Sequence, residues 1–299
     1  MQRITTLLAA CCAPAALAAQ ATGATEVWRL AGTTLPVAQA LSTGGGSALW
    51  NPAQRPPTGR ASVCFEIIQT PAAVGATGVL VVGRIRVSPV GELGLVYGSM
   101  GISDLVRTTS SPSQDSGSIP FYAQFVAANW TVTKRGTTLG ATLGVQDVRF
   151  DEIRAQRAAF DIGATQMLPG AIRMAAAAHV FAPLAAGDAS HDVYGGVERR
   201  MWRGAMWRGS GPVSVIARYG VALGHGFNAD HHVGVGLDVG GQLLVDVQMA
   251  REGGYGGAGW RGSAGVRIRI GRYRVSYARD AGLSDIGSAY RVGLEAQIK

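Results

Sequence analysis

Apolar and polar residues alternate along most of the chain beyond residue 60. In Val266–Ile270 the apolar side chains share one face, while Arg267 and Arg269 share the other. The segment Tyr290–Lys299 repeats the pattern, with apolar residues at even positions and mostly polar residues at odd positions. A period of two is typical of β-strands that have one apolar and one polar face. The pattern therefore predicts an all-β fold for this part of the chain.

About fourteen such segments follow one another, separated by turn-like stretches that contain glycine and proline. The separators are short except near Thr108–Ser118 and Ala281–Ser288, where we expect longer loops. One strand, Val82–Val87, has a change of phase at Gly83, and Val37–Leu49 is the one segment with a helical or irregular pattern. The predicted strands are Ser62–Gln69, Val82–Val87, Gly91–Gly98, Phe121–Thr133, Thr138–Val148, Ala158–Met167, Ile172–Phe181, Asp192–Met201, Val213–Leu223, Val233–Val239, Leu243–Ala250, Val266–Ile270, Arg272–Tyr277 and Tyr290–Lys299.

The first residues have the form of a secretory signal peptide. Arg3 gives a positive start, an apolar stretch runs from Ile4 to Leu17, and small residues provide a cleavage site. We therefore predict a signal peptide over residues 1–19. Lipoprotein cleavage before Cys11 is a minor alternative. Removal of the signal peptide leaves Cys64 alone, which excludes an intramolecular disulfide and a zinc site built on cysteines.

Composition narrows the classes of protein that fit these strands. Charged residues make up 15% of the chain and 43 residues are glycine, and this scarcity of charge disfavours both disorder and an ordinary soluble enzyme. The net charge of +8 comes almost entirely from arginines that are spread along the chain, so we expect no nucleic-acid partner. No apolar run beyond residue 20 is long enough for a transmembrane helix. A membrane form of this chain must therefore be a closed barrel.

Short turns that alternate with longer loops are typical of outer-membrane barrels. We predict an antiparallel transmembrane β-barrel of about fourteen strands in the bacterial outer membrane, with lipid as one partner. A secreted soluble sandwich or barrel that binds a ligand is the alternative, because its strands would alternate equally well. Aromatic residues near the predicted strand ends or on apolar faces favour the membrane, namely Trp130, Trp202, Trp207, Tyr219, Trp260, Tyr273, Tyr277 and Tyr290.

The segment Ala40–Ala53 contains three glycines and ends in Asn-Pro-Ala just before the first predicted strand. It resembles the corresponding segment of the PorV/PorQ-like proteins, within the FadL-type outer-membrane transporter superfamily. Gly94–Asp104 and Ala159–Gly170 are also similar to this group. The C-terminal Arg291–Ile298 resembles the signal read by the barrel assembly machinery, although the chain then ends in Lys299 rather than an aromatic residue.

The resemblance implies a barrel of fourteen antiparallel strands with an N-terminal segment folded into the lumen. It thus divides the rest of the chain into a lumenal plug segment over 20–60 and a barrel over 61–299. It also implies one of two functions, namely passage of hydrophobic small molecules, as in FadL-like members, or support of protein secretion, as in PorV-like members. Hydrophobic solutes or secreted proteins would then be the partners. Glycine and proline suit a plug that passes close to the barrel wall. The motif residues expected in that plug are Gly44, Gly45, Gly46, Asn51 and Pro52.

Rows of arginine remain to be placed. On the lipid face each arginine would cost ~2–4 kcal/mol at the midplane, so we expect the rows to face the lumen. There they either pair with inward acids and brace the wall, which we favour, or attract an anionic head group such as a fatty-acid carboxylate. The candidate lumen-facing residues are Arg84, Arg86, Arg267, Arg269, Arg272, Arg274, Glu66, Asp246 and Glu295.

Metal and catalytic chemistry find little support. The densest group of ligand-type residues, from His225 to His232, reads as a polar hairpin loop, because neighbouring side chains on a strand point to opposite faces. An outer-membrane lipid hydrolase would need a serine or aspartate with a nearby histidine on facing strands. His179 and Ser214 lie in predicted strands, but their spacing identifies no triad and no Gly-x-Ser-x-Gly elbow occurs. The stretch Gly253–Gly259 lacks the Lys-Ser/Thr of a phosphate loop. We expect no enzyme activity, no metal and no cofactor.

Overall fold

The computed structural model describes residues 32, 34–54, 59–70, 75–103, 105, 117–182, 191–205, 211–223, 229–254, 257–281 and 288–298. The predicted signal peptide lies outside the described residues, as do Trp207 and His225. No helix in these ranges is long and apolar enough to cross a membrane.

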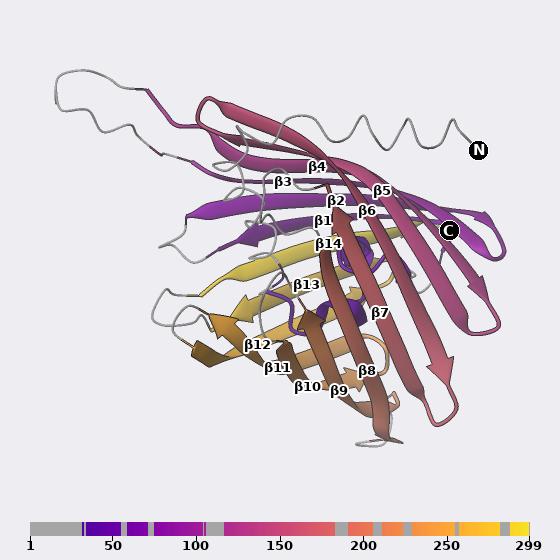
Figure 1. Ribbon diagram of the computed structural model, residues 1–299. Coiled ribbons are helices and arrows are strands. Elements are labelled where there is room, and N and C mark those ends of the chain that lie inside the picture. The colour runs from indigo at the N-terminus through magenta and orange to yellow at the C-terminus, as the bar shows by residue number, and fades with distance from the viewer. Residues whose placement is uncertain are drawn as a thin grey trace.

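Fourteen strands form one closed barrel (Figure 1). Each strand pairs in an antiparallel manner with its neighbours in chain order, and β1 pairs with β14 to close the sheet. This confirms the predicted fourteen-stranded antiparallel barrel. The strands are β1 (Ala61–Gln69), β2 (Ala76–Ser88), β3 (Gly91–Ile102), β4 (Phe121–Lys134), β5 (Thr137–Phe150), β6 (Ile153–Leu168), β7 (Ile172–Phe181), β8 (His191–Gly204), β9 (Val213–Leu223), β10 (Asp230–Val239), β11 (Leu243–Gly254), β12 (Gly257–Ile270), β13 (Tyr273–Asp280) and β14 (Tyr290–Ile298).

One detail of the predicted pattern is wrong. The pairing of β2 with β1 and with β3 runs without a break through Gly83, so no change of phase occurs there. Val82 is buried on the same inward face as Arg84, whereas Ile85 is exposed on the outer face. The irregularity in this strand lies between Arg86 and Ser88, where the register with β3 shifts. The reason is that the inward face of β2 is itself partly apolar, which a simple alternation of apolar and polar residues does not allow.

The two ends of the barrel differ in their connections. Tight turns join Ser88 to Gly91 and Lys134 to Thr137 at the end where the last strand finishes. The longest connection, from Ile102 to Phe121, lies at the opposite end, although Phe150 and Ile153 are joined tightly there too. Outer-membrane barrels have short periplasmic turns and longer external loops. We therefore name these the periplasmic end and the extracellular end.

The outer face of the wall is an apolar belt. Along most strands the exposed residues alternate with less exposed ones, and in β1 the exposed positions are Val63, Phe65 and Ile67. A closed sheet with such a belt satisfies every requirement of a lipid environment, because no strand edge is left unpaired. The protein is thus a barrel of the outer membrane. Other large apolar residues of the belt include Leu93, Leu95, Val126, Leu143, Val145, Phe160, Ile162, Met174, Val233, Val235, Val247, Ile268, Val275, Val292 and Leu294.

Residues 34–54, which we call the plug, lie inside the barrel (Figure 1, indigo). The plug contains two 3-10 helices, η2 (Gln39–Leu41) and η3 (Gly45–Leu49), joined by irregular chain. This agrees with the helical or irregular pattern predicted for Val37–Leu49. Buried apolar clusters lie between plug and wall: Trp50 packs with Ile68 and Met100, for example. The core of the molecule is therefore the interface between the plug and the inner face of the strands.

Candidate functional site

Glycines in the wall allow the plug to approach the strands closely. A Cβ atom at Gly140 of β5 would lie 2.3 Å from the carbonyl carbon of Pro52, and one at Gly163 of β6 would lie 2.2 Å from Asn51 Oδ1. No real Cβ atom tolerates such distances. The same kind of contact occurs between Gly196 and Leu41, between Gly220 and Ala38, and between Gly265 and Pro36.

The predicted glycine motif lies against β1. A Cβ on Gly45 would lie 2.1 Å from the Cβ of Cys64, and one on Gly46 would lie 2.2 Å from Glu66 Oε1. Gly44 has a φ of 112°, a value that glycine adopts without strain. Both kinds of constraint exclude larger residues from this part of η3. Cys64 itself is buried in β1.

Asn51 and Pro52 form the turn at the end of the plug. The Asn51 amide donates to the Ala40 carbonyl at 3.0 Å, and its Oδ1 accepts from the Ala53 backbone N–H at 2.9 Å. Gln54 donates to the same Ala40 carbonyl at 2.8 Å. These bonds tie the two ends of the plug together, so it has internal structure of its own and does not depend on the wall alone.

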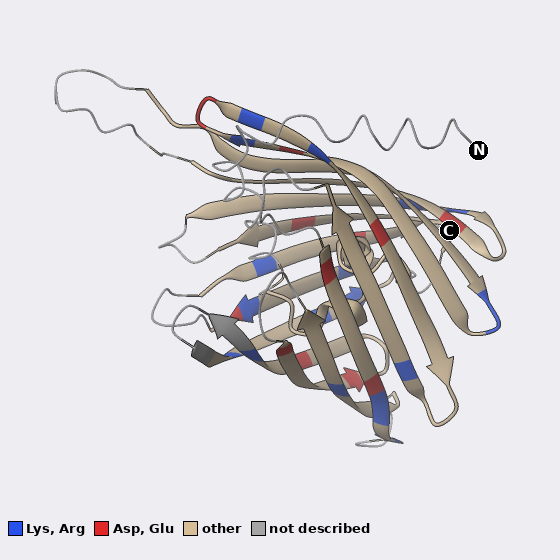
Figure 2. Cartoon of the chain, viewed as in Figure 1, with Lys and Arg blue, Asp and Glu red and all other residues tan. Residues whose placement is uncertain are grey.

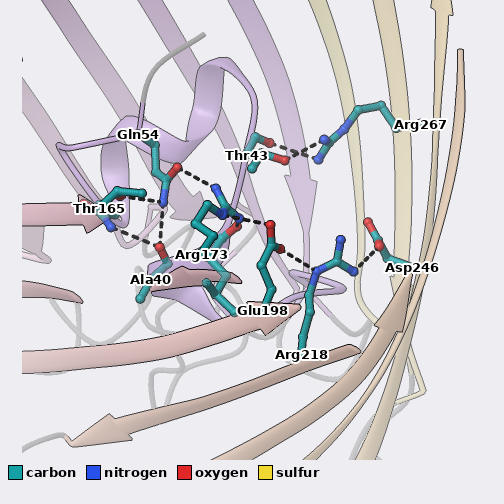
Figure 3. A network of polar contacts seen from close by, with 11 residues as sticks. Ala40, Thr43, Gln54, Thr165, Arg173, Glu198, Arg218, Asp246 and Arg267 are labelled. Atoms are coloured by element: carbon teal, nitrogen blue, oxygen red, sulfur yellow. Dashed lines mark hydrogen bonds and ion pairs between the residues drawn. The ribbon is translucent and has the colours of Figure 1, made fainter. Parts of the chain in front are cut away.

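Arginines of the wall hold the plug by its backbone (Figure 3). Arg173 of β7 donates to the Leu41 carbonyl at 2.7 Å and to Gln54 Oε1 at 3.0 Å. Arg267 of β12 donates to Thr43 Oγ1 at 2.7 Å and to the Thr43 carbonyl at 2.9 Å. Arg84 of β2 also holds the plug, because it donates to the backbone carbonyl of Gln54. The plug is therefore fixed from several directions.

An ion-pair network crosses the inner wall beside the plug (Figure 3). Glu198 of β8 lies between two arginines, with Oε1 2.9 Å from Arg173 Nε and Oε2 3.0 Å from Arg218 Nε. Arg218 of β9 also pairs with Asp246 of β11. Because Arg173 reaches the plug as well, the network links four strands of the wall, β7, β8, β9 and β11, to the plug backbone.

Most of the candidate lumen-facing residues lie on inward faces of their strands and are paired. Arg274 lies 2.9 Å from Glu295, whose Oε2 also accepts from the Gly45 backbone N–H at 3.0 Å. Glu66 pairs at 3.3 Å with Arg291, and Arg86 lies 3.6 Å from Glu92. Together with the Arg218–Asp246 pair above, these pairs join side chains within the wall. This arrangement fits the bracing role favoured above better than the binding of an anion.

Two of the candidate arginines lie at the periplasmic rim. Arg269 shares the inward face of β12 with Arg267 and lies opposite Arg274 of β13, but it is exposed at the end of the strand. Arg272 is not a wall residue, because β12 ends at Ile270 and β13 begins at Tyr273. It lies exposed in the turn, with its guanidinium carbon 4.9 Å from the centre of the Tyr273 ring. The prediction for Arg272 was wrong because the two residues of the turn keep the alternation of the flanking strands in phase, so the turn cannot be told from a strand by the pattern alone.

A largely apolar cavity lies beside the plug on the side of β3–β8. The space in it that protein atoms leave unfilled is about 860 Å³, including the part that opens to solvent. Leu49 and Trp50 of the plug line it, and the lining extends to Phe181 at the extracellular end of β7. Aromatic and aliphatic lining residues from the wall include Val96, Phe125, Ala127, Ala159, Phe181 and Tyr194.

A polar cluster marks one side of this cavity. His179 lies between wall and plug, with Nδ1 3.0 Å from Asp161 Oδ1 and Nε2 3.0 Å from the Trp50 carbonyl oxygen. Arg157 donates through Nε to Gln146 at 2.6 Å, and its guanidinium carbon lies 4.3 Å from the centre of the Phe181 ring. The cavity thus combines apolar walls with a few fixed polar groups, as is typical of small-molecule sites.

The remaining candidates do not come together. Ser214 lies opposite Arg203 and Asp238 near the periplasmic end of β9, whereas His179 is opposite Asp161 and Asp192 on β6 and β8. The pairing register therefore separates the two residues that a hydrolase would need.

The predicted polar loop around His231 has no metal geometry in its described part. His232 is buried on the inner face, while His231 faces outward and hydrogen-bonds the Tyr219 hydroxyl at 2.8 Å. Among the described residues no group of three or more histidine, cysteine, aspartate or glutamate side chains is placed to hold a metal ion.

Sequence reasoning named Asp246 of the network and His179 of the polar side of the cavity, but it missed their partners. Arg291 stands at an odd position of Tyr290–Lys299 beside Glu295, so the same alternation could have found it. Arg173, Glu198 and Arg218 lie on three different strands, and only the register brings them together.

Comparison with known proteins shows the same architecture. The chain is similar in structure to the toluene transporter TbuX of Ralstonia pickettii, with a TM-score of 0.57 and 12% identity over 91% of this chain and 100% of that one. It is also similar to the toluene transporter TodX of Pseudomonas putida, with a TM-score of 0.52 and 8% identity over 89% of this chain and 96% of that one. No family model matches the sequence, and no curated protein does.

At these identities the likeness shows the fold. The chain shares the closed β-barrel fold of these two transporters. This fold agrees with the coarser resemblance to FadL-type barrels, whereas the narrower resemblance to PorV/PorQ-like proteins stays a prediction.

Proposed function

We propose that the protein carries small hydrophobic molecules across the outer membrane and binds them in the cavity beside the plug. The observation that supports this most directly is the lining of the cavity, in which Phe125, Phe181 and Tyr194 of the wall face Trp50 and Leu49 of the plug. Apolar solutes gain free energy when they leave water for such a lining. The likeness to two toluene transporters supports the same general function.

The plug separates this cavity from a second one on the other side of the lumen, so a solute that crosses the barrel would have to pass the plug. The second cavity, with about 620 Å³ of unfilled space including open solvent, lies between η3 and β11–β14 and β1. Its lining includes Glu66, Arg274 and Glu295, so it is far more polar than the first. A hydrophobic solute would bind in the first cavity rather than in the second, because it cannot replace the interactions of the charged groups there with water. Movement out of the apolar cavity would therefore require a rearrangement of plug or wall.

The charged lumen does not favour an anionic head group as the main determinant of binding. Arg274 and Arg218 are paired with acids, while Arg84 and Arg267 hold the plug backbone. We therefore propose that these arginines position the plug, and that the apolar part of the solute supplies most of the binding energy.

A substitution that fills the cavity tests the proposal. Ala159 lines the cavity, whereas its neighbour Ala158 is exposed on the lipid face of the same strand. In proteoliposomes we expect Ala159→Phe to lower uptake of labelled toluene by about tenfold, which corresponds to about 1.4 kcal/mol of lost binding free energy. Ala158→Phe should leave uptake unchanged. Equal uptake by both variants and the parent would contradict a role for this cavity, and uptake no faster than in protein-free vesicles would contradict transport.

Support of protein secretion is the second proposal, and it rests on the resemblance of Ala40–Ala53 to PorV/PorQ-like proteins. In that case an exported protein would bind the barrel from outside the plugged lumen. Cross-linking in intact cells, followed by purification of the barrel, should then capture secreted proteins in amounts comparable to the barrel. Recovery of the barrel alone would contradict this second function without affecting the first.

A further inference from the structure

The exposed charged side chains described at the periplasmic end are all basic. Its exposed basic residues have no exposed acidic counterpart among the described residues of this end, where Glu92 is buried and Asp238 is partly buried and accepts from the Gly241 backbone N–H. Figure 2 shows the contrast with the other end, since the β4–β5 turn is blue and the β5–β6 turn is red. The exposed basic residues are Arg60, Lys134, Arg135, Arg199, Arg200, Arg203, Arg269 and Arg272.

Lys134 continues a column of lipid-facing residues. It is the last residue of β4 and lies on the same outward face as Val126 and Trp130, which are 59% and 54% exposed. The outward column of this strand therefore passes from an aliphatic residue, through an indole ring, to an ammonium group. This is the order of chemistry met on passing from the acyl chains of a membrane to its head groups.

Arg272 repeats this order at another point of the rim, whereas Arg199 shares the outward face of β8 with an indole ring that lies beyond it toward the periplasmic end. Arg199 lies opposite Ile172, the first residue of β7, and on the outward face that also carries the exposed Trp202. Arg272 stacks on the Tyr273 ring, which begins the outward column of β13. Each of the three basic residues thus accompanies an aromatic residue at the periplasmic edge of the apolar belt, and Arg272 is in direct contact with its ring.

We propose that Lys134, Arg199 and Arg272 bind the phosphate groups of anionic phospholipids in the periplasmic leaflet of the membrane. Basic residues at a membrane surface attract anionic lipid by about 1 kcal/mol each, and the guanidinium group matches the geometry of phosphate. The neighbouring rings place these charges at the depth of the head groups. A soluble anion or an acidic protein would gain nothing from rings directed into the lipid, so the aromatic partners favour the lipid.

Lipid selectivity in nanodiscs tests this proposal. The purified full chain is placed in phosphatidylcholine nanodiscs that contain a small fraction of spin-labelled phosphatidylglycerol or of spin-labelled phosphatidylcholine. We expect the parent protein to immobilise phosphatidylglycerol about threefold to fivefold more strongly than phosphatidylcholine, as one basic contact for each bound lipid implies. The variant Lys134→Gln, Arg199→Gln, Arg272→Gln should bring the ratio close to one, and Lys134→Arg, Arg199→Lys, Arg272→Lys should restore it.

A matched variant at the extracellular end separates local binding from net charge. Arg149→Gln, Arg251→Gln, Arg279→Gln removes the same charge from three exposed arginines near that end and should keep the preference. The proposal is overturned if the parent protein does not distinguish the two lipids, or if both glutamine variants lower the ratio equally. It is also overturned if millimolar glycerol phosphate abolishes the preference, because the site would then bind soluble phosphate. The shift in gel mobility between folded and heated protein shows that each variant is folded.

Discussion

The outer and inner faces of the barrel wall differ in how strictly they constrain their side chains. On the outer face, residues such as Leu95 and Leu143 are both 67% exposed and contact a fluid solvent of acyl chains, so many apolar side chains would serve equally well. On the inner face, Gly163 accommodates one atom of Asn51, and Glu198 pairs with two named arginines. The difference shows that the outer face selects a class of residue, whereas the inner face selects individual residues.

The largest effect is expected from Glu198→Ala on the inner face. The change leaves the guanidinium groups of Arg173 and Arg218 facing each other, although Arg218 keeps Asp246. Removing one partner of a buried ion pair costs ~3–5 kcal/mol, and the partial exposure of the Glu198 side chain, 19%, places the expected loss near the lower limit. Urea titration of the barrel in lipid vesicles measures it. Glu152→Ala, at an exposed acid of the β5–β6 turn, should cost less than about 1 kcal/mol. An equal loss of stability in both variants would contradict the claim that the inner face depends on individual residues.

The second effect tests the outer face. Leu143 lies at the middle of β5, so Leu143→Arg should lower the free energy of unfolding by ~2–4 kcal/mol in the same titration. Leu143→Phe keeps the residue apolar and should change it by less than about 1 kcal/mol, because lipid adapts to either shape. If the arginine variant were as stable as the parent in lipid, the belt described above would not lie in the membrane.

The third effect compares two glycines directly. Gly163→Leu forces a side chain into Asn51 and Pro52, at a cost of ~1–3 kcal/mol, and should displace the plug so that ionic conductance across a planar bilayer rises. Gly83→Leu places the same side chain on the outer face, where nothing lies within 4 Å of the new Cβ, and stability should stay within about 0.5 kcal/mol. Similar conductance in both variants would show that the plug does not depend on the glycine contacts.

Alternation along the chain was sufficient to predict the strands and the apolar belt, because both are local consequences of a period of two. In β14, for instance, Val292 and Leu294 are exposed and Arg291 and Glu295 are buried, as predicted. The change of phase placed at Gly83 and the wall position given to Arg272 were wrong, because a local pattern registers neither an apolar inner face nor a tight turn that keeps its period.

The inner contacts depend on information that alternation does not contain. Whether Glu198 meets Arg173 and Arg218 depends on the register of β8 with both neighbours, and a shift of one residue would turn it toward lipid. The cavity depends in addition on where the plug lies across the barrel, since Trp50 and Leu49 form part of its lining. Closure of the sheet and the position of the plug set these contacts, and both are properties of the whole chain.

The plug precedes every strand in the chain, yet it touches strands from both ends of the sequence. Gln54 accepts a hydrogen bond from Arg84 on β2, and Gly45 donates one to Glu295 on β14. While the seam between β1 and β14 is unpaired, the nascent sheet is open along its length; once the seam forms, its backbone bonds run from Ala61–Ile298 to Gln69–Tyr290. Biogenesis must therefore enclose the N-terminal segment during the last zippering step, and a seam that closed early would trap an empty cylinder.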